Sequence, residues 1–376
     1  MTDPDFIPPA RPQVGEDEIE AAVRVLRTGM VVQGPEVAGF EDEFAALVDG
    51  RTCVAVNSGT SALQLSLMAL RLQPGDEVVV PSFSFAASAN AIRLAGGEPV
   101  FVDIDPTTFC LDPAAVEAAV GPRTVAMMPV HLYGHPADMT ALGAIAERHG
   151  LAVVEDAAQA HGATWQGRPV GAFGVAGCFS FYPTKNMHSL EGGMVSTADE
   201  DFARTIRLLR NQGMLQQYAN EVVGANMRLP DVAAAVGRAQ LPKLRAWNKQ
   251  RRANAEVLTA GLRGADQGGV VAPAIADGAE HVFHQYTIRV PGGAERRDRV
   301  REQLREHGVG TGVYYPTPIH LLKPYRPGEH PTNRDWDLPE TMRAAAEVLS
   351  LPVWPGLTDD QLARIVDAVN AVIGAH

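Results

Sequence analysis

One lysine stands in a segment too apolar for an ordinary solvated charge. Lys185 lies in the stretch FSFYPTKNMHSLEGGMVST, residues 179–197, between a run of aromatic residues and a glycine pair. An apolar pocket favours the neutral form of a lysine amine, and a neutral amine can attack a carbonyl carbon to form a Schiff base. Most lysines at a strand end instead extend their ammonium group into water, so position alone leaves both roles open.

Two further segments could hold a charged ligand. Asp156 follows the apolar run LAVV, and a carboxylate at a buried strand end needs strong donors or a cation, such as a protonated ligand nitrogen. A structural ion pair or a helix cap fits the same position equally well. The turn NSGTSAL, residues 57–63, precedes a helix that we expect to begin near Thr60, and the free N–H groups of such a helix suit a phosphate.

A Schiff-base lysine, a carboxylate for a pyridinium nitrogen and a helix N-terminus for a phosphate are the contributions that pyridoxal 5′-phosphate (PLP) requires from a protein. All three occur in one region of this chain. The glycine patterns of nucleotide-triphosphate loops and of dinucleotide sites are missing, so neither ATP nor NAD is favoured. The sequence therefore predicts a PLP site.

These residues must be positioned by an α/β framework. Apolar runs of strand type alternate with helical patterns from about residue 52 to residue 197, which predicts a mostly parallel sheet covered on both faces. Ligands of such sheets bind at the carboxyl ends of the strands, so we expect the site there. The apolar runs are TCVAV, DEVVVPS, EPVFVDI, TVAMMPV and LAVVEDA.

The pattern changes in the last third of the chain. Residues 230–262 have helical spacing, with an expected kink or break at Pro242. Two expected strands, HVFHQYTIRV and VGTGVYYP, and two expected helices, RRDRVREQLREHG and DDQLARIVDAVNAVI, then follow. We predict a large PLP-binding α/β domain at residues 1–263, including an N-terminal helix, and a smaller C-terminal α+β domain at residues 264–376.

Composition excludes several other classes of function. The net charge of −12 argues against binding of nucleic acid or of an anionic membrane surface, because both need clustered basic residues. No apolar run reaches the length of about 18 residues that a membrane-spanning helix needs, and the residues MTDPDFIPPARP lack the basic and apolar regions of a secretory signal, so we expect neither membrane insertion nor secretion. The three cysteines are widely spaced, which favours the reducing cytoplasm. The histidines lack the Cys and Glu companions of a zinc site, so we predict no metal.

Five motifs, in order and spacing, resemble the DegT/DnrJ/EryC1/StrS family of PLP-dependent aminotransferases, which act on nucleotide-linked keto-sugars. The resemblance covers most of the chain. It implies the fold-type I architecture, with a seven-stranded, mostly parallel sheet in the large domain and two subunits in a two-fold dimer. The motifs are NSGTSAL, PSFSFAASANAI, VEDAAQAHGA, FSFYPTKN with the following EGGMVST, and GANMRLPDVAAAVGRAQL.

The resemblance implies a role for each matching residue. Lys185 matches the lysine that forms the internal aldimine, and Asp156 matches the carboxylate that pairs with the pyridine nitrogen. Asn226 matches an asparagine that reaches the phosphate of the second subunit, so each site would be shared between subunits. Phe85 matches the ring that stacks on the pyridine, Gln159 a side chain near its O3′ oxygen, and Gly59, Thr60 and Ser180 the phosphate cradle. Candidate substrate contacts are His188, Arg228, Tyr315 and His320.

The predicted activity is transfer of an amino group, from L-glutamate as the resemblance implies, to a keto-sugar linked to dTDP, UDP or GDP. The family's dehydratase branch has histidine in place of the lysine, so Lys185 disfavours that reaction. Amination of a keto-cyclitol and another PLP-dependent sugar reaction remain open as alternatives. A regulatory protein that keeps the fold without turnover is a third alternative, although it would not need the intact lysine.

Overall fold

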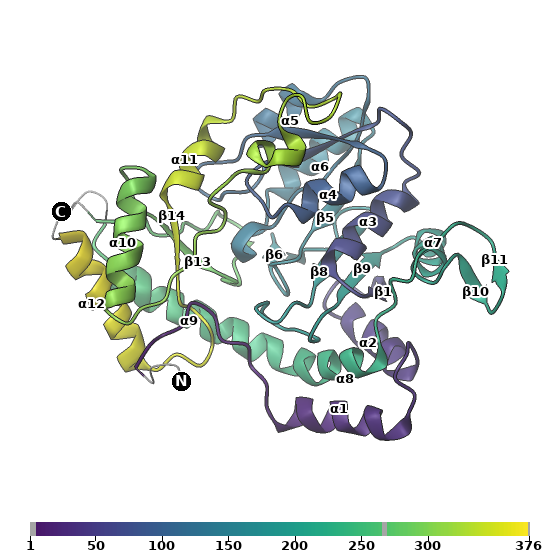
Figure 1. Ribbon diagram of the computed structural model, residues 1–376, viewed down its shortest axis with the longest axis horizontal. Helices are drawn as coiled ribbons and strands as arrows, with labels where there is room; N and C mark the ends of the chain where they lie inside the picture. Colours follow the sequence, from purple (N-terminus) through teal and green to yellow (C-terminus); the bar gives the residue numbers. More distant parts are fainter. Residues whose placement is uncertain (1–4, 265–268, 375–376) are drawn as a thin grey trace.

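Seven strands form one sheet in the computed structural model, which describes residues 5–264 and 269–374 (Figure 1). Their order along the sheet is β1-β9-β8-β5-β4-β2-β3. Strand β9 runs antiparallel to both of its neighbours, and the pairs from β8 to β3 are parallel. The predicted mostly parallel, seven-stranded sheet is confirmed. The strands are β1 (Thr52–Val56), β2 (Glu77–Pro81), β3 (Glu98–Val102), β4 (Thr124–Met127), β5 (Ala152–Asp156), β8 (Ala176–Ser180) and β9 (Gly193–Thr197).

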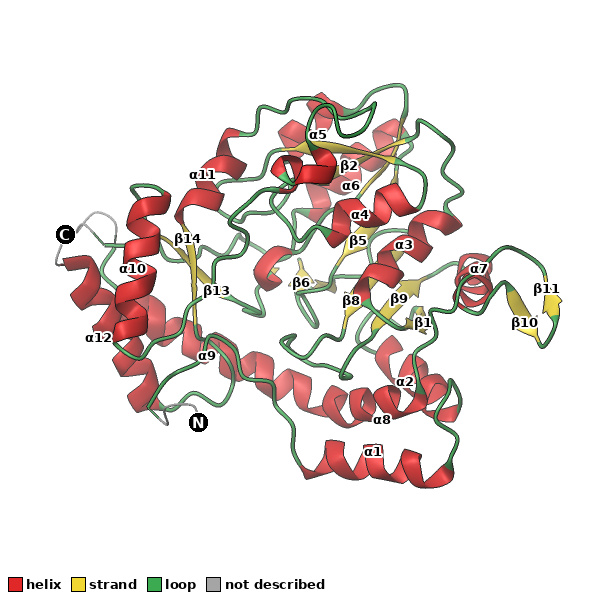
Figure 2. Ribbon diagram, in the orientation of Figure 1, coloured by secondary structure: helices red, strands yellow, loops and turns green. Residues whose placement is uncertain are grey.

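Helices cover both faces of this sheet (Figure 2). Successive side chains of a strand point to opposite faces, so Val78 and Val80 pack in one hydrophobic cluster and Val79 packs in another. Burial on both faces explains why the strands are continuous apolar runs. The first cluster includes residues of α3 (Gly59–Ala69), α4 (Ala87–Leu94) and α7 (Glu200–Arg210), and the second includes residues of α5 (Pro113–Ala119) and α6 (Met139–His149).

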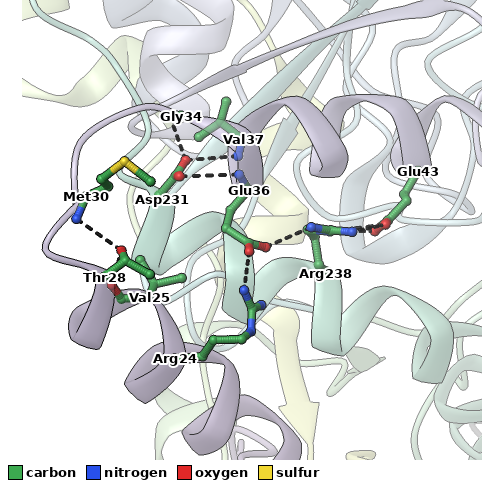
Figure 3. A network of polar contacts seen from close by, with 10 residues as sticks. All are labelled: Arg24, Val25, Thr28, Met30, Gly34, Glu36, Val37, Glu43, Asp231 and Arg238. Atoms are coloured by element: carbon green, nitrogen blue, oxygen red, sulfur yellow. Dashed lines mark hydrogen bonds and ion pairs between the residues drawn. The ribbon is translucent and has the colours of Figure 1, made fainter.

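A polar network joins the two N-terminal helices to α8 (Figure 3). The buried carboxylate of Asp231, at the start of α8, accepts hydrogen bonds from three backbone N–H groups at the start of α2, among them that of Gly34 at 2.7 Å. On α2, Glu36 forms ion pairs with Arg24 and Arg238. The network fixes the position of Asp231, the first residue of α8. It thereby fixes the C-terminal end of the segment that precedes α8, residues 221–230. The helices are α1 (Glu16–Thr28), α2 (Pro35–Ala45) and α8 (Asp231–Gln240).

The predicted interruption at Pro242 is confirmed. A short 3-10 turn, Leu241–Lys243, separates α8 from α9 (Leu244–Gly261), because proline lacks the N–H group that a continuous helix would use. With 18 residues, α9 carries several charged side chains along its length. Among the helices of the described residues, none combines the length and the apolar character that crossing a membrane requires.

The C-terminal elements share a hydrophobic core with the end of α9. Leu258 of α9 belongs to one cluster with Ile288, Val300, Leu349 and Ile365. The expected boundary between residues 263 and 264 adjoins residues 265–268, which lie outside the described residues, and the division into two domains stays a prediction. The elements here are β13 (Tyr286–Arg289) paired antiparallel with β14 (Val348–Leu351), and the helices α10 (Ala294–Glu306), α11 (Pro339–Glu347) and α12 (Asp359–Gly374).

The expected strand VGTGVYYP does not form. Val309 makes an isolated bridge with Ile7, and Gly312 makes one with Ser350, so the segment pairs with two different neighbours and no continuous ladder results. The short strands of the described chain are β6 (Thr164–Trp165), β7 (Arg168–Pro169) and β12 (Ala279–Glu280) in one sheet, and β10 (Met214–Gln216) and β11 (Ala219–Asn220) in a hairpin that projects from the body in Figure 1.

Candidate active site

Asp156 and the loop that carries Lys185 leave the sheet at the same edge. Asp156 is the last residue of β5, and Lys185 lies in the loop that follows β8. Strands β5 and β8 are parallel neighbours, with Asp156 opposite Cys178 in the register. Since the carboxyl ends of parallel strands meet at one edge, two motifs that are separate in the sequence come together there.

Lys185 has the electrostatic character expected of a nucleophilic amine. Its side chain is half-buried, and burial lowers its pKa from the usual 10.5 to about 8, against the opposing effect of the negative charge on Asp156. A lowered pKa increases the neutral, nucleophilic fraction of the amine near physiological pH. The lowered pKa therefore agrees with attack on a carbonyl carbon.

Asp156 is a buried carboxyl group with donors on both oxygens. The hydroxyl of Ser88 donates to Oδ2 at 2.8 Å, and the backbone N–H of Ala158 donates to Oδ1 at 3.2 Å. Burial raises the pKa of Asp156, and the hydrogen bond from Ser88 opposes that shift. The charges of Asp156 and Lys185 influence each other, but within the described residues no ion pair joins them. A protonated ring nitrogen would provide the cationic partner that this buried carboxylate lacks.

The turn before α3 has the form of an anion site. Ser58 caps the helix by accepting the N–H of Ser61 at 3.1 Å, and Gly59 and Thr60 open the first turn. A side chain at Gly59 would place its Cβ 2.6 Å from the Cβ of Ser180, so only glycine allows the end of β8 to approach the helix N-terminus. The predicted phosphate residues Gly59, Thr60 and Ser180 are thus neighbours in space, beside free N–H groups that favour negative charge.

Gln159 connects this edge of the sheet to the C-terminal part of the chain. Its Oε1 accepts the backbone N–H of Tyr133 at 2.7 Å, and its Nε2 donates to the hydroxyl of Tyr315 at 3.0 Å. The ring centroid of Phe85 lies 5.9 Å from that of Tyr315. Phe85 remains 59% exposed, so its ring is accessible for stacking on a ligand.

These groups fit PLP. Lys185 would carry the cofactor, Asp156 would hold its ring nitrogen, and the start of α3 with Ser180 would hold its phosphate. The fit rests on three observations: an amine of lowered pKa, a buried carboxylate without an ion pair, and a close approach at Gly59 that a larger residue would obstruct.

The two histidines among the candidate substrate residues make contacts within the chain. His188 is buried, its Nε2 lies 3.1 Å from the carbonyl oxygen of Gln13, and its Nδ1 accepts the N–H of Leu190 at 3.3 Å. Burial lowers its pKa, so the ring is neutral with Nε2 as the donor. His320 is also buried, and its Nδ1 lies 2.7 Å from the hydroxyl oxygen of Ser82. Both rings hold segments together through these contacts, and their role toward a substrate stays a prediction.

Asn226 and Arg228 lie together in the segment between the β10–β11 hairpin and α8. Asn226 is exposed, and its backbone bridges to Asn211. Arg228 donates from Nη1 to the side-chain oxygen of Asn211 at 2.8 Å. An exposed asparagine here is available to another molecule, and its predicted role toward a second subunit stays a prediction.

Sequence reasoning missed Ser88 and Tyr133, which hold Asp156 and Gln159 through hydrogen bonds. A local signal existed for Ser88, because it lies one helical turn after Ser84 and three residues after Phe85. Toward Gln159, Tyr133 contributes only its backbone N–H, which any residue except proline could supply. Nothing in the residue pattern could have identified it.

The sheet order and the grouping of Lys185, Asp156 and the α3 turn define a fold-type I, PLP-dependent aminotransferase. Residues 12–370 match the sequence model of the DegT/DnrJ/EryC1/StrS aminotransferase family, and the chain belongs to that family. It is an aminotransferase, and its cofactor is PLP.

Named relatives and a solved structure agree with this membership. The chain is 46% identical to dTDP-3-amino-3,4,6-trideoxy-alpha-D-glucose transaminase of Streptomyces venezuelae, over 94% of this chain and 91% of the relative. It is 42% identical to UDP-N-acetyl-3-dehydro-alpha-D-glucosamine 3-aminotransferase of Acidithiobacillus ferrooxidans, over 95% and 94%. The crystal structure of S. venezuelae DesV in complex with a ketimine intermediate superposes with a TM-score of 0.89 at 44% identity, covering 95% of this chain and 94% of that one.

Proposed function

We propose that this aminotransferase moves an amino group from L-glutamate to a keto-sugar carried on a nucleotide, which gives an amino sugar. The observation that carries the proposal is the pair formed by Lys185, with its lowered pKa, and the buried Asp156 at one edge of the sheet. The names of the two relatives, which contain a dTDP-linked and a UDP-linked sugar, support a sugar nucleotide as acceptor.

Each residue has a defined task in this proposal. PLP, when bound, supplies a ring that accepts electrons from the reacting carbon. Asp156 keeps the ring nitrogen protonated through its negative charge. The Nζ atom of Lys185 would hold the cofactor and, when free, would act as the acid and base that moves the proton of the donor's α-carbon. Phe85 and Gln159 keep the ring in one orientation.

We also propose a homodimer with shared sites, in the cytoplasm. Support for the dimer comes from large apolar side chains that are exposed near the segment of Asn226 and in the loop before α2, among them Val223 at 92% and Val32 at 67%. Support for the cytoplasm comes from three free, buried cysteines. Mixing the Lys185→Ala and Asn226→Ala proteins tests the sharing, because a mixed dimer would regain one complete site. No gain of activity after subunit exchange would contradict it.

The test of the function has two arms. Purified protein should show the visible absorbance of lysine-bound PLP, which borohydride fixes to Lys185, and Lys185→Ala should lose both the absorbance and turnover. Amine transfer from L-glutamate should then be assayed against a panel of dTDP-, UDP- and GDP-linked keto-sugars and a keto-cyclitol. Turnover of the cyclitol alone would replace the proposed acceptor, and no transfer to any acceptor, despite bound PLP, would favour a regulatory role.

A further inference from the structure

Two buried serine hydroxyls stand in line behind the carboxylate of Asp156. The Oγ of Ser88 donates to Oδ2 of Asp156 at 2.8 Å, and the Oγ of Ser84 lies 3.0 Å from that of Ser88. Ser84 is 3% exposed and Ser88 is fully buried. The hydrogen bonding of Asp156 therefore continues through two further polar groups inside the protein.

The hydrogen bonds of this row run in one direction while Asp156 is ionised. A carboxylate accepts and does not donate, so the single proton of Ser88 goes to Asp156 and the hydroxyl of Ser84 donates to Ser88. A neutral carboxyl group would reverse the row, and the proton of Ser84 would then need another acceptor. Among the described residues, the side chain of Ser84 forms a hydrogen bond only with Ser88. The row therefore favours the ionised form of Asp156.

Ser88 differs from an ordinary buried serine of a helix. Such a hydroxyl commonly donates to the carbonyl oxygen four residues earlier, as Ser66 of α3 does toward Ala62 at 2.8 Å. Ser88, near the start of α4, is as deeply buried as Ser66, yet it donates to a side chain 68 residues away. Helix formation alone does not account for this contact.

The row connects two parts of the sheet that are not neighbours. Ser84 lies between β2 and α4, Asp156 ends β5, and β4 lies between β2 and β5 in the sheet. The backbone of Asp156 is held separately, because its N–H donates to the carbonyl oxygen of Pro129 at 2.8 Å and its carbonyl oxygen accepts the N–H of His131 at 3.0 Å. Removal of a serine hydroxyl should therefore affect the side chain of Asp156 and leave its backbone anchored.

Asp156 needs such support because burial disfavours its charge. Burial raises the pKa of Asp156, and the hydrogen bond from Ser88 is the largest of the effects that oppose this rise. The N–H of Ala158 and the charges of Lys185 and His131 oppose it as well. Only the ionised carboxylate can stabilise a protonated ring nitrogen through its charge. The state of Asp156 therefore depends on the serine that donates to it.

We propose that Ser84 and Ser88 are positioning residues that form a relay of two hydroxyls, which keeps Asp156 ionised and fixes its carboxylate for the ring nitrogen of PLP. The inference rests on the proposed role of Asp156 and adds the residues that control it. Phe85 lies between the two serines in the sequence. The start of α4 thus supplies both the ring that would stack on the cofactor and the hydroxyls that control the carboxylate at the cofactor's edge.

The first test measures the ionisation of Asp156 directly. Apo-protein with ¹³C-labelled aspartate carboxyl groups is titrated by nuclear magnetic resonance, and Asp156→Asn assigns the signal. In Ser88→Ala the midpoint should rise by about one pH unit, because a hydrogen bond to the charged form is lost. Ser88→Thr, which keeps the hydroxyl, should titrate like wild type. Ser66→Ala is the matched control, a fully buried helical serine, and should leave the midpoint unchanged.

Ser84→Ala distinguishes a relay from two independent contacts. Its midpoint should rise less than that of Ser88→Ala, because the bond from Ser88 to Asp156 remains. The double variant should match Ser88→Ala, since Ser84 acts only through Ser88. An unchanged midpoint in either single variant, or an additive shift in the double variant, overturns the relay. Should Ser88→Ala not fold, the midpoint of Ser84→Ala decides.

The second test asks whether the relay acts on the ring nitrogen. Apo-protein is titrated with PLP and with 1-deazapyridoxal phosphate, in which a C–H group replaces that nitrogen, and binding is followed by protein fluorescence. We expect the preference for PLP to fall about 10-fold in Ser88→Ala, more in Asp156→Asn, and not in Ser66→Ala. Equal weakening of both compounds in Ser88→Ala would indicate a packing role and overturns the proposal.

The outcomes separate the relay from the function on which it rests. An unchanged preference in Asp156→Asn means that Asp156 does not hold the ring nitrogen, which overturns its proposed role and the relay with it. Neither test involves amine transfer. Loss of the preference in Ser88→Ala, in a protein that transfers no amine to any keto-sugar, overturns the proposed function and leaves the relay standing.

Discussion

The lowered pKa of Lys185 predicts how fast the apo-protein captures PLP as pH changes. Burial lowers this pKa from 10.5 to about 8. At pH 7 a pKa of about 8 leaves roughly 10% of the amine neutral, whereas a pKa of 10.5 leaves roughly 0.03%, a difference of about 300-fold. Since only the neutral amine attacks the aldehyde, the capture rate should rise with pH up to about 8 and then level off.

Asp156→Asn is the informative perturbation of the same amine. The negative charge of Asp156 raises the pKa of Lys185, so its removal should lower that pKa further. The variant should therefore capture PLP faster than wild type at pH 7. It should nevertheless hold PLP less tightly, because the ring nitrogen loses its anionic partner.

The assay is stopped-flow absorbance of the apo-protein mixed with PLP between pH 6 and pH 10. Nα-acetyllysine at each pH corrects for titration of PLP itself, and Lys185→Ala controls for other lysines. The reasoning is refuted if the corrected rate still rises steeply above pH 9, or if Asp156→Asn shifts its midpoint to higher pH. Either result would mean that burial does not control the charge of Lys185.

Two further predictions concern packing. Gly59→Ala should destabilise the protein by about 1–3 kcal/mol and weaken PLP binding, because its Cβ would lie 2.6 Å from that of Ser180. Gly143→Ala is the control, because no atom lies within 4 Å of the new Cβ, and it should be neutral or stabilising in thermal unfolding. Equal effects of the two substitutions would count against the predicted phosphate site at Gly59. The thiols of Cys53 and Cys110, whose pKa burial raises to about 12, should react with Ellman's reagent only after denaturation, and rapid labelling of native protein at pH 8 would contradict their burial.

Much of the framework was predictable because its causes are local. The five expected apolar runs correspond to β1, β2, β3, β4 and β5, since strands buried on both faces must be continuously apolar. Pro242 interrupts the α8–α9 helix through its own missing N–H group. The expected strand VGTGVYYP does not form, because strand pairing depends on which segments the fold brings alongside. Its two isolated bridges go to different segments of the chain.

The chemistry of the site divides in the same way. The sequence by itself determined which groups are present: a lysine in an apolar segment, an aspartate at a strand end and a glycine turn before a helix. Only the tertiary structure decided their states, because a pKa depends on burial and on charges brought from elsewhere in the chain. Lys185 acquires its lowered pKa in this way, and His188 its fixed, neutral ring.

The neighbouring arginines of α9 illustrate the limit most clearly. In the stretch KQRRAN, Arg251 and Arg252 have the same side chain and nearly the same local surroundings. Consecutive residues of a helix point about 100° apart, so the fold buries Arg251 and leaves Arg252 in an ion pair with Glu280. Sequence determined that two guanidinium groups lie on this helix. Packing of the helix against the C-terminal elements decided which of them is desolvated, because desolvation is a property of the surroundings and not of the residue.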